Sequence, residues 1–393
     1  MEQLIIGGVI SFLVTFYGIP VVIQVASEKK LFDVPDARKV HKAPIPSLGG
    51  LAMFSGFLIA LLLTVNIAGN TSFQYYVASF LIIFLLGMKD DIIIITPIKK
   101  FVGQAIVAGL LATKGSLLIT SMHGFLGINH LDPTASYFLT FFTVIGVINA
   151  FNLIDGIDGL AGSLGLITSA VFGTYFFING DLTHALLGFT FAGALAAFLI
   201  YNFNPAKIFM GDTGSMLLGL VNVILVIRFI EMGPVFTAHP VSASPAIGFG
   251  ILLLPIMDTL RVFGIRILHR RSPFSPDKNH LHHILLEKGM SHKAISLSIA
   301  GASILPITFC FLFQSLGNTA IVTGLIAFFF AGIYLLKSVK VRTQQLHVVK
   351  DEDEEWNDLA MQEEHLAASS VKLVPFYQKK GAKKAVAAGE DEP

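Results

Sequence analysis

The stretch FLIIFLLGMKDDIIIITPIKK, residues 80–100, joins a long apolar run to two adjacent aspartates, Asp90 and Asp91. A run this apolar is typical of a helix that lies in lipid, where a carboxylate is costly to bury. The whole chain has the same character: 54% of its 393 residues are hydrophobic, 13% are charged, and the mean hydropathy is +0.73. This composition excludes a water-soluble domain of this size and predicts an integral membrane protein.

Apolar runs of about 20 residues predict an all-α polytopic membrane protein with about eleven transmembrane helices. The first run is interpreted as a retained helix, because no cleavable signal pattern precedes it. The segment 114–135 is longer than a turn and predicts a small external hairpin. The predicted spans are 3–25, 48–67, 73–89, 99–113, 136–154, 159–178, 183–201, 209–230, 246–267, 296–315 and 319–336.

The basic residues between the spans predict which side each loop faces. The segments 26–46 and 268–295 are rich in Lys and Arg, whereas loops such as 67–72 and 177–182 contain none. By the positive-inside rule, the N-terminus is expected outside and the C-terminus in the cytosol.

Two domains are expected from composition. Residues 1–338 form the transmembrane domain, and residues 339–393 form a charged cytosolic tail whose composition is typical of disorder. The only cysteine, Cys310, excludes an intramolecular disulfide.

Three more aspartates are expected at the same membrane face as Asp90 and Asp91. Asp155 and Asp158 lie in NAFNLIDGIDGLAG, residues 149–162, and Asp212 lies in FMGDTGSMLLG, residues 209–219. Each has an ordinary alternative, namely a solvated helix end for the pair, a breaker loop for 155–158, and a helix cap for Asp212. Five converging carboxylates, however, need a compensating cation, and oxygen ligands favour Mg²⁺ or Mn²⁺ over zinc.

A basic loop, RRSPFSPDKNHLHHILLEKG at residues 270–289, carries His280, His282 and His283. Their spacing does not match the i, i+4 pair of zinc enzymes, so phosphate binding together with nearby Arg and Lys is preferred. Carboxylates, glycine-lined helix ends and a basic loop together predict a diphosphate site beside the lipid. The residues alone thus indicate a membrane enzyme that joins a phosphorylated lipid to a phosphorylated cytosolic partner.

Five motifs, in order over about residues 1–338, resemble the polyprenyl-phosphate N-acetylhexosamine-1-phosphate transferase family. Its bacterial undecaprenyl-phosphate GlcNAc-1-phosphate branch, part of glycosyltransferase family 4, is the most similar. The motifs are KVHKAPIPSLGG (39–50), the aspartate pair before IIIITPIKK (92–100), NAFNLIDGIDGLAG (149–162), YNFNPAKIFMGDTGS (201–215) and SPFSPDKNHLHH (272–283).

The resemblance implies a reaction. An N-acetylhexosamine 1-phosphate, expected to be GlcNAc-1-phosphate, passes from a UDP-sugar to undecaprenyl phosphate and releases UMP. The product would start a cell-surface glycan such as lipopolysaccharide or another cell-wall polymer, at the cytoplasmic face of the bacterial inner membrane. The expected partners are the two substrates and the lipid bilayer, with a homodimer as a further expectation and no nucleic acid.

The resemblance also implies roles for individual residues, with Mg²⁺ as the cofactor and Mn²⁺ as its substitute. Phe209 is expected to stack on uracil. The metal ligands are expected to be Asp212 and Asn152. The catalytic group is Asp90, Asp91, Asp155, His282 and His283. The substrate-binding group is Lys42, Lys100, Asp158, Asn202, Phe209, His280 and Arg271.

Two alternatives stay open on sequence grounds. The lipid phosphate could attack directly, or an aspartate could first form a phosphoaspartyl intermediate. A secondary transporter would place acids at the bilayer midplane on repeated halves, and a non-catalytic scaffold for glycan assembly would not need five polar motifs. Asp258 is the one acid predicted inside a span, where an ion pair with Arg261 at i+3 is expected.

Overall fold

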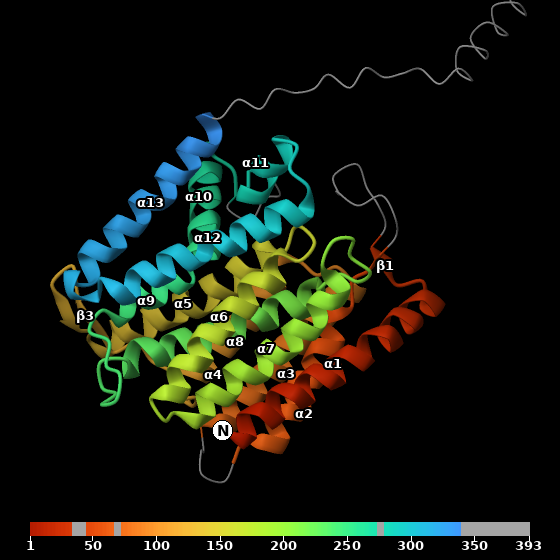
Figure 1. Ribbon diagram of the computed structural model, residues 1–393, viewed down its shortest axis with the longest axis horizontal. Helices are drawn as coiled ribbons and strands as arrows, with labels where there is room; N and C mark the ends of the chain where they lie inside the picture. The colour runs from red at the N-terminus through yellow and green to blue at the C-terminus, as the bar shows by residue number, and fades with distance from the viewer. Residues whose placement is uncertain (34–44, 67–71, 273–278, 339–393) are drawn as a thin grey trace, which may run out of the picture. The chain divides into compact units, whose positions relative to one another are not determined.

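The computed structural model describes residues 1–33, 45–66, 72–272 and 279–338 (Figure 1). The predicted tail, 339–393, and Lys42 lie outside the described residues. In chain order the elements are α1 (Glu2–Lys29), β1 (Phe32–Asp33), β2 (Ile45–Pro46), α2 (Gly49–Thr64), α3 (Phe73–Ile92), α4 (Pro97–Thr113), β3 (Ser121–Phe125), β4 (Ile128–His130), α5 (Pro133–Ile154), α6 (Leu160–Ile178), α7 (Leu182–Asn202), α8 (Gly211–Met232), α9 (Ser244–Ile251), α10 (Leu253–Leu268), α11 (Leu281–Glu287), α12 (His292–Leu312), the 3₁₀ helix Gln314–Leu316 and α13 (Asn318–Ser338).

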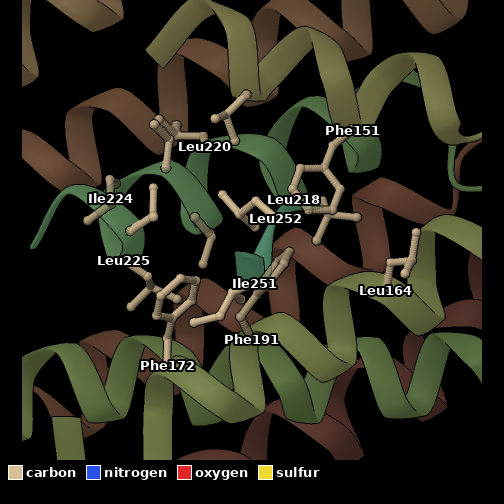
Figure 2. Close-up of a cluster of buried hydrophobic side chains, with 14 of the residues drawn as sticks. Phe151, Leu164, Phe172, Phe191, Leu218, Leu220, Ile224, Leu225, Ile251 and Leu252 are labelled. Carbon is tan, nitrogen blue, oxygen red and sulfur yellow. The ribbon is translucent and has the colours of Figure 1, made fainter. Parts of the chain in front are cut away.

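Helix α8 is the central element of the bundle. It packs against α2, α3, α5, α6, α7 and α9, and 94% of its most apolar window is buried, compared with 22% for α1 and for α13. Figure 2 shows its side chains, among them Leu218, Leu220 and Ile224, in contact with the apolar core. Hydropathy alone does not explain this place, because α1 and α13 are at least as apolar as α8 and are mostly exposed.

Glycines bring two helices close to the first turn of α8. A side chain on Gly50 of α2 would put its Cβ 2.7 Å from Gly214 Cα, and one on Gly87 of α3 would come within 2.5 Å of Thr213 Cα. These distances leave no room for a Cβ, so α2 and α3 pack with their backbones against α8. This packing places the ends of three helices at one point.

An all-α polytopic membrane protein is confirmed, but eleven spans are not. Each predicted span contains helix, and in the described residues seven helices are long and apolar enough to cross a membrane: α1, α5, α6, α7, α8, α12 and α13. An eighth is reached if α9 and α10, bent by 78° relative to each other, count as one broken span. Helix α2, with 16 residues, is shorter, and α3 and α4 are not among the seven.

The predicted hairpin within 114–135 is present as the antiparallel strands β3 and β4. Thr120, just before β3, donates from its backbone N and its Oγ1 to the Glu231 carboxylate in the last turn of α8, at 2.8 and 2.7 Å. The hairpin is therefore fixed to the end of α8 that lies away from Asp212.

Candidate active site

The candidate site forms around the turn that leads into α8. The PSLGG motif runs alongside this turn: Phe209 N donates to Pro46 O at 2.8 Å, and Gly49 N donates to Phe209 O at 2.9 Å. Gly211 has a φ of +71°, and a Cβ there would lie 2.7 Å from an Asp91 carboxylate oxygen. Only glycine fits this position, so two distant motifs together set the direction of the Asp212 side chain.

Asp91 holds the beginning of α8 from the end of α3. Its carboxylate accepts hydrogen bonds from Asp212 N at 2.7 Å, Thr213 N at 3.0 Å and Thr213 Oγ1 at 2.5 Å. The first N–H groups of a helix lack partners within the helix, and a carboxylate there is stabilised by the helix dipole. Asp91 therefore acts as a capping group from another helix.

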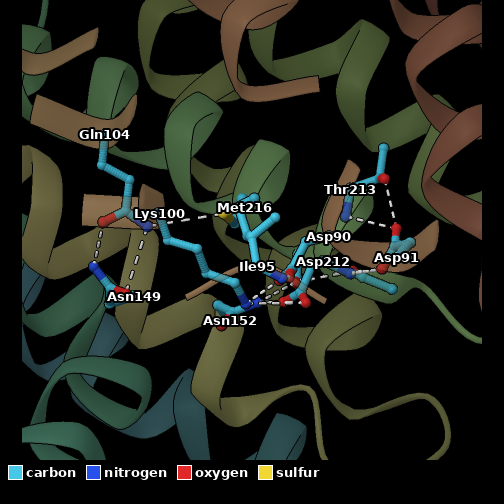
Figure 3. Close-up of polar contacts among 12 residues, drawn as sticks. Asp90, Asp91, Ile95, Lys100, Gln104, Asn149, Asn152, Asp212, Thr213 and Met216 are labelled. Atoms are coloured by element: carbon cyan, nitrogen blue, oxygen red, sulfur yellow. Dashed lines mark hydrogen bonds and ion pairs between the residues drawn. The ribbon is translucent and has the colours of Figure 1, made fainter. Parts of the chain in front are cut away.

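Asp90 makes different contacts from its neighbour, as expected for adjacent helical positions that point about 100° apart. It accepts a hydrogen bond from Ile95 N at 2.7 Å and forms an ion pair with Lys100 Nζ. The same ammonium lies 3.1 Å from Asp212 Oδ2, so one positive charge interacts with two carboxylates (Figure 3). Asp90, Lys100 and Asp212, predicted from separate motifs, meet in one cluster.

Asn152, in the last turn of α5, completes this cluster. Its Nδ2 donates to Asp212 Oδ1 and to Ser215 Oγ, the latter at 2.9 Å. Beside the cluster lies a cavity of about 190 Å³ between α4, α5 and α10. Its walls combine polar and apolar side chains: Ile95, Pro97, Lys100, Phe101, Gln104, Asn149, Asn152, Leu153, Phe263 and Arg266.

A pair of amides in the wall of this cavity was not predicted from the sequence. Asn149 Nδ2 donates to Gln104 Oε1 at 2.7 Å, which links α5 to α4, and Gln104 is 1% exposed. Gln104 lies one helical turn after Lys100, and Asn149 lies one turn before Asn152. This spacing could have indicated both amides from the sequence, because side chains one turn apart share a helix face.

The turn between α5 and α6 carries Asp155 and Asp158. The Asp158 carboxylate accepts hydrogen bonds from Asn204 Nδ2 at 3.1 Å and Ala206 N at 3.2 Å, and it lies 3.3 Å from His292 Nδ1. Burial alone would raise the pKa of Asp158, but these groups outweigh it and lower the pKa. Asp158 thus ties this turn to the segment before α8 and to α12.

Asp155 is different, because its half-buried carboxylate makes no hydrogen bond to any described residue. Burial, followed by the negative charges of Asp212, Asp91 and Asp158, raises the pKa of Asp155 to about 7. An acid without a partner in a charged cluster is typical of a functional site.

The Asn202 side chain links the turn before α6 to the segment before α8. Its Oδ1 accepts from Gly159 N and its Nδ2 donates to Ile208 O, both at 2.9 Å, and the residue is 4% exposed. Phe209 is half-buried before α8, and Arg271 is exposed after α10. The substrate-binding roles of these three residues stay predictions.

The described part of the histidine loop contains the short helix α11, and His282 of this helix lies against Gly156. A Cβ on Gly156 would lie 2.6 Å from His282 Cε1, and His282 is 1% exposed. Neither ring nitrogen of His282 has a hydrogen-bond partner among the described residues. Burial, followed by the charges of His283 and His280, lowers the pKa of His282 to about 3, so its ring is neutral at pH 7.

His280 binds Asp258 of α10. Its Nδ1 lies 2.8 Å from Asp258 Oδ2, and the predicted pair of Asp258 with Arg261 is confirmed at 2.8 Å. The histidines therefore differ in their surroundings: His280 is bound to α10, His282 lies against the glycine turn, and the His283 ring is centred 4.2 Å from that of His282.

Comparison with known proteins identifies a matching family and similar proteins. A model of glycosyl transferase family 4 matches residues 73–230. A decaprenyl-phosphate N-acetylglucosaminephosphotransferase of Mycobacterium leprae (strain TN) is 34% identical over 324 residues, which cover 76% of this chain and 81% of the relative.

Two further relatives come from other bacteria. A probable undecaprenyl-phosphate N-acetylglucosaminyl 1-phosphate transferase of Bacillus subtilis (strain 168) is 33% identical over 76% of this chain and 82% of its own length. An undecaprenyl-phosphate alpha-N-acetylglucosaminyl 1-phosphate transferase of Yersinia pestis is 30% identical, over 72% and 77%.

Proposed function

The chain belongs to glycosyl transferase family 4, and on this premise we propose that it transfers N-acetylglucosamine 1-phosphate from UDP-GlcNAc to a polyprenyl phosphate. The observation that carries the proposal is the convergence of Asp90, Lys100, Asn152 and Asp212, from α3, α4, α5 and α8, at one end of the bundle. The printed names of the relatives support the acceptor and the transferred group. Neither this convergence of side chains nor the names of the relatives favours a transporter or a scaffold.

The reaction we propose is an in-line displacement at phosphorus. An oxygen of the lipid phosphate forms a bond to the β-phosphorus of the UDP-sugar, while the bond from that phosphorus to the bridging oxygen breaks. UMP leaves with the electron pair. Lys100 offsets the charge on the departing phosphate, and Asp90 orients Lys100 through their ion pair. Direct attack needs no further nucleophile, so we favour it over a phosphoaspartyl intermediate.

We propose Mg²⁺ as the cofactor, because the side chains that meet at Asp212 are carboxylates and an amide rather than thiols. Among the described residues no three His, Cys, Asp or Glu side chains lie close enough to share a metal ion. Magnesium in phosphate-handling enzymes needs only one or two carboxylates and completes its shell with substrate phosphates and water. We propose that Asp212 and Asn152 hold it, with Mn²⁺ as a substitute. When bound, the ion supplies charge stabilisation to the diphosphate.

We place the site at the cytoplasmic face of a bacterial inner membrane. Lys and Arg gather in the loops on the side of Asp212, including the exposed Arg270 and Arg271, which supports that orientation. A reporter fused after Pro393 should then behave as cytosolic and one inserted at Gly180 as external. The opposite labelling would contradict this orientation. Undecaprenyl phosphate as the acceptor, a homodimer, and a role in starting lipopolysaccharide or another cell-wall glycan stay proposals.

The function is tested by UMP release. Purified protein is incubated with undecaprenyl phosphate, Mg²⁺ and each of UDP-GlcNAc, UDP-GalNAc and UDP-glucose. We expect UMP and a lipid-linked sugar with UDP-GlcNAc, dependent on the lipid and lost with chelator. Transfer from no UDP-sugar under these conditions would overturn the proposal, and transfer only from another sugar would revise the donor.

A further inference from the structure

We propose that Asp258 is a positioning residue of the active site: from α10, its carboxylate holds α11 so that His282 stays against the glycine turn after α5. The expected effect on turnover rests on the transferase function proposed above. The anchoring of α11 by Asp258 does not depend on that function. Asp258 belongs to none of the five motifs that indicate the family, and it lies inside a predicted span.

Three donors converge on the Asp258 carboxylate, which is 1% exposed. Arg261 Nη2 donates to Oδ1 at 2.8 Å, His280 Nδ1 lies 2.8 Å from Oδ2, and Leu281 N donates to Oδ1 at 2.9 Å. The last of these is the N–H of the first residue of α11, and His280 is the residue before it. One carboxylate therefore binds the start of α11 through both its backbone and its side chain.

Helix α11 is held by this contact together with the burial of Leu281, His282 and Leu285. It has seven residues and no capping side chain of its own. A helix of this length is not stable alone in water, so a group that caps its first turn helps to hold it in place. Arg261 Nη2 also donates to Asn279 O, so the Asp258–Arg261 pair holds the chain on both sides of His280.

The anchored end of α11 lies two residues from the part that faces the site. His282 has no hydrogen-bond partner among the described residues for either ring nitrogen, although it is almost fully buried. Its ring lies against Gly156, the residue that follows Asp155 in the chain. A displacement of about 1 Å is enough to lower the rate of an oriented reaction by about a hundredfold. Releasing α11 should therefore reduce turnover even though Asp258 does not touch substrate.

Asp181 offers a matched control. It also accepts from a histidine ring, His184 Nδ1 at 2.8 Å, and from an arginine, Arg228 Nε at 3.0 Å, and it caps α7 through His184 N. It precedes a 21-residue helix whose other end approaches the site, so it lies about 30 Å away along that helix. The same three kinds of contact thus occur once beside the site and once far from it.

The experiment compares Asp258→Asn with Asp181→Asn. Hydrogen–deuterium exchange should become faster in residues 281–287 for Asp258→Asn only. Its kcat/KM for UMP release should fall about ten- to a hundredfold, while Asp181→Asn stays within twofold of wild type. In a His282→Ala background the Asp258→Asn substitution should cost less than twofold, because both changes act through the same ring.

Several results would overturn the proposal: unchanged exchange in α11, wild-type kcat/KM in Asp258→Asn, or the same loss with and without His282. If Asp258→Asn does not fold, His280→Ala is used instead, because it removes one of the three donors. It should also speed exchange in residues 281–287 and lower kcat/KM, by a smaller factor. A His280→Ala variant without these two changes would count against the proposal. A wild-type protein without UMP release would refute the proposed function, while the exchange data would still decide the anchoring.

Discussion

Asp155 and Asp181 lie at opposite ends of α6, the first before it and the second after it, and they differ in every contact. Burial alone would raise the pKa of Asp181, but the hydrogen bonds and charge of His184 and the charge of Arg228 lower it to about 2. Asp155 has no such partners in the part of the chain that the structure describes, and its pKa is raised to about 7. A carboxylate whose partners are supplied by its own fold is structural, whereas one beside like charges with no partner among the described residues is typical of a functional site.

Among substitutions at the site end of the bundle, where Asp155 lies, Asp212→Asn is expected to lower the reaction rate most. Its carboxylate faces both Lys100 and Asn152, and we propose it as the metal ligand. Loss of such a ligand removes about 4 kcal/mol of transition-state stabilisation, roughly a thousandfold in rate. UMP release over a Mg²⁺ titration measures this. Near-wild-type turnover would remove Asp212 from the chemistry and leave the two ends equivalent.

Asp90→Asn should come next, with about a hundredfold loss of kcat and little change in UDP-sugar affinity. The expected reason is that Asp90 orients Lys100, whose charge is needed chiefly in the transition state. Steady-state kinetics, with nucleotide-sugar binding measured by calorimetry, separate the two parameters. Weakened binding with intact turnover would place Asp90 on the donor side of the reaction instead.

Asp181→Asn tests the other end through stability rather than rate. The pKa of Asp181 is about 2 in the folded protein and close to 3.8 when unfolded, so its ionisation contributes about 2 kcal/mol above pH 4. This contribution is lost as the pH falls through about 2. The variant should therefore unfold at a lower temperature at pH 7, and by a smaller margin toward pH 3. Equal margins at both pH values would show that charge is not the cause.

Asp155→Asn should give the smallest effect on stability, with the opposite sign. Because the pKa of Asp155 is raised to about 7, protonated Asp155 adds to the free energy of unfolding. This contribution is complete below pH 4 and is lost as the pH rises toward 7. With chelator present, the variant should melt at a higher temperature than wild type at pH 8 and at about the same temperature at pH 4. A lower melting temperature at pH 8 would mean that the ionised Asp155 has a partner.

The sequence predicted helices better than it predicted their geometry. Long apolar runs located α5 to α8 closely because bilayer length and hydropathy act on each segment alone. The break between α9 and α10 was missed, although Pro255 lacks the N–H that would bond to Ile251 and its ring crowds that carbonyl. Hydropathy averages over a window and does not detect such a bend.

The candidate site was predictable in membership but not in contacts. Motif residues such as Asp90, Lys100 and Asp212 do meet. The capping of α8 by Asp91 depends on a partner 122 positions away, and no local pattern encodes that distance. The pair of Asp258 with Arg261 was predictable because its members are three residues apart, whereas its bond to His280, 22 residues on, was not.

The glycine contacts at Gly50 and Gly87 limit how this enzyme can be changed. Because backbone meets backbone there, any larger side chain forces α2 or α3 away from α8 and moves the Asp212 turn. A library aimed at a new sugar donor should therefore leave these positions fixed. Variation is better directed to an exposed position of the segment before α8, such as Lys207.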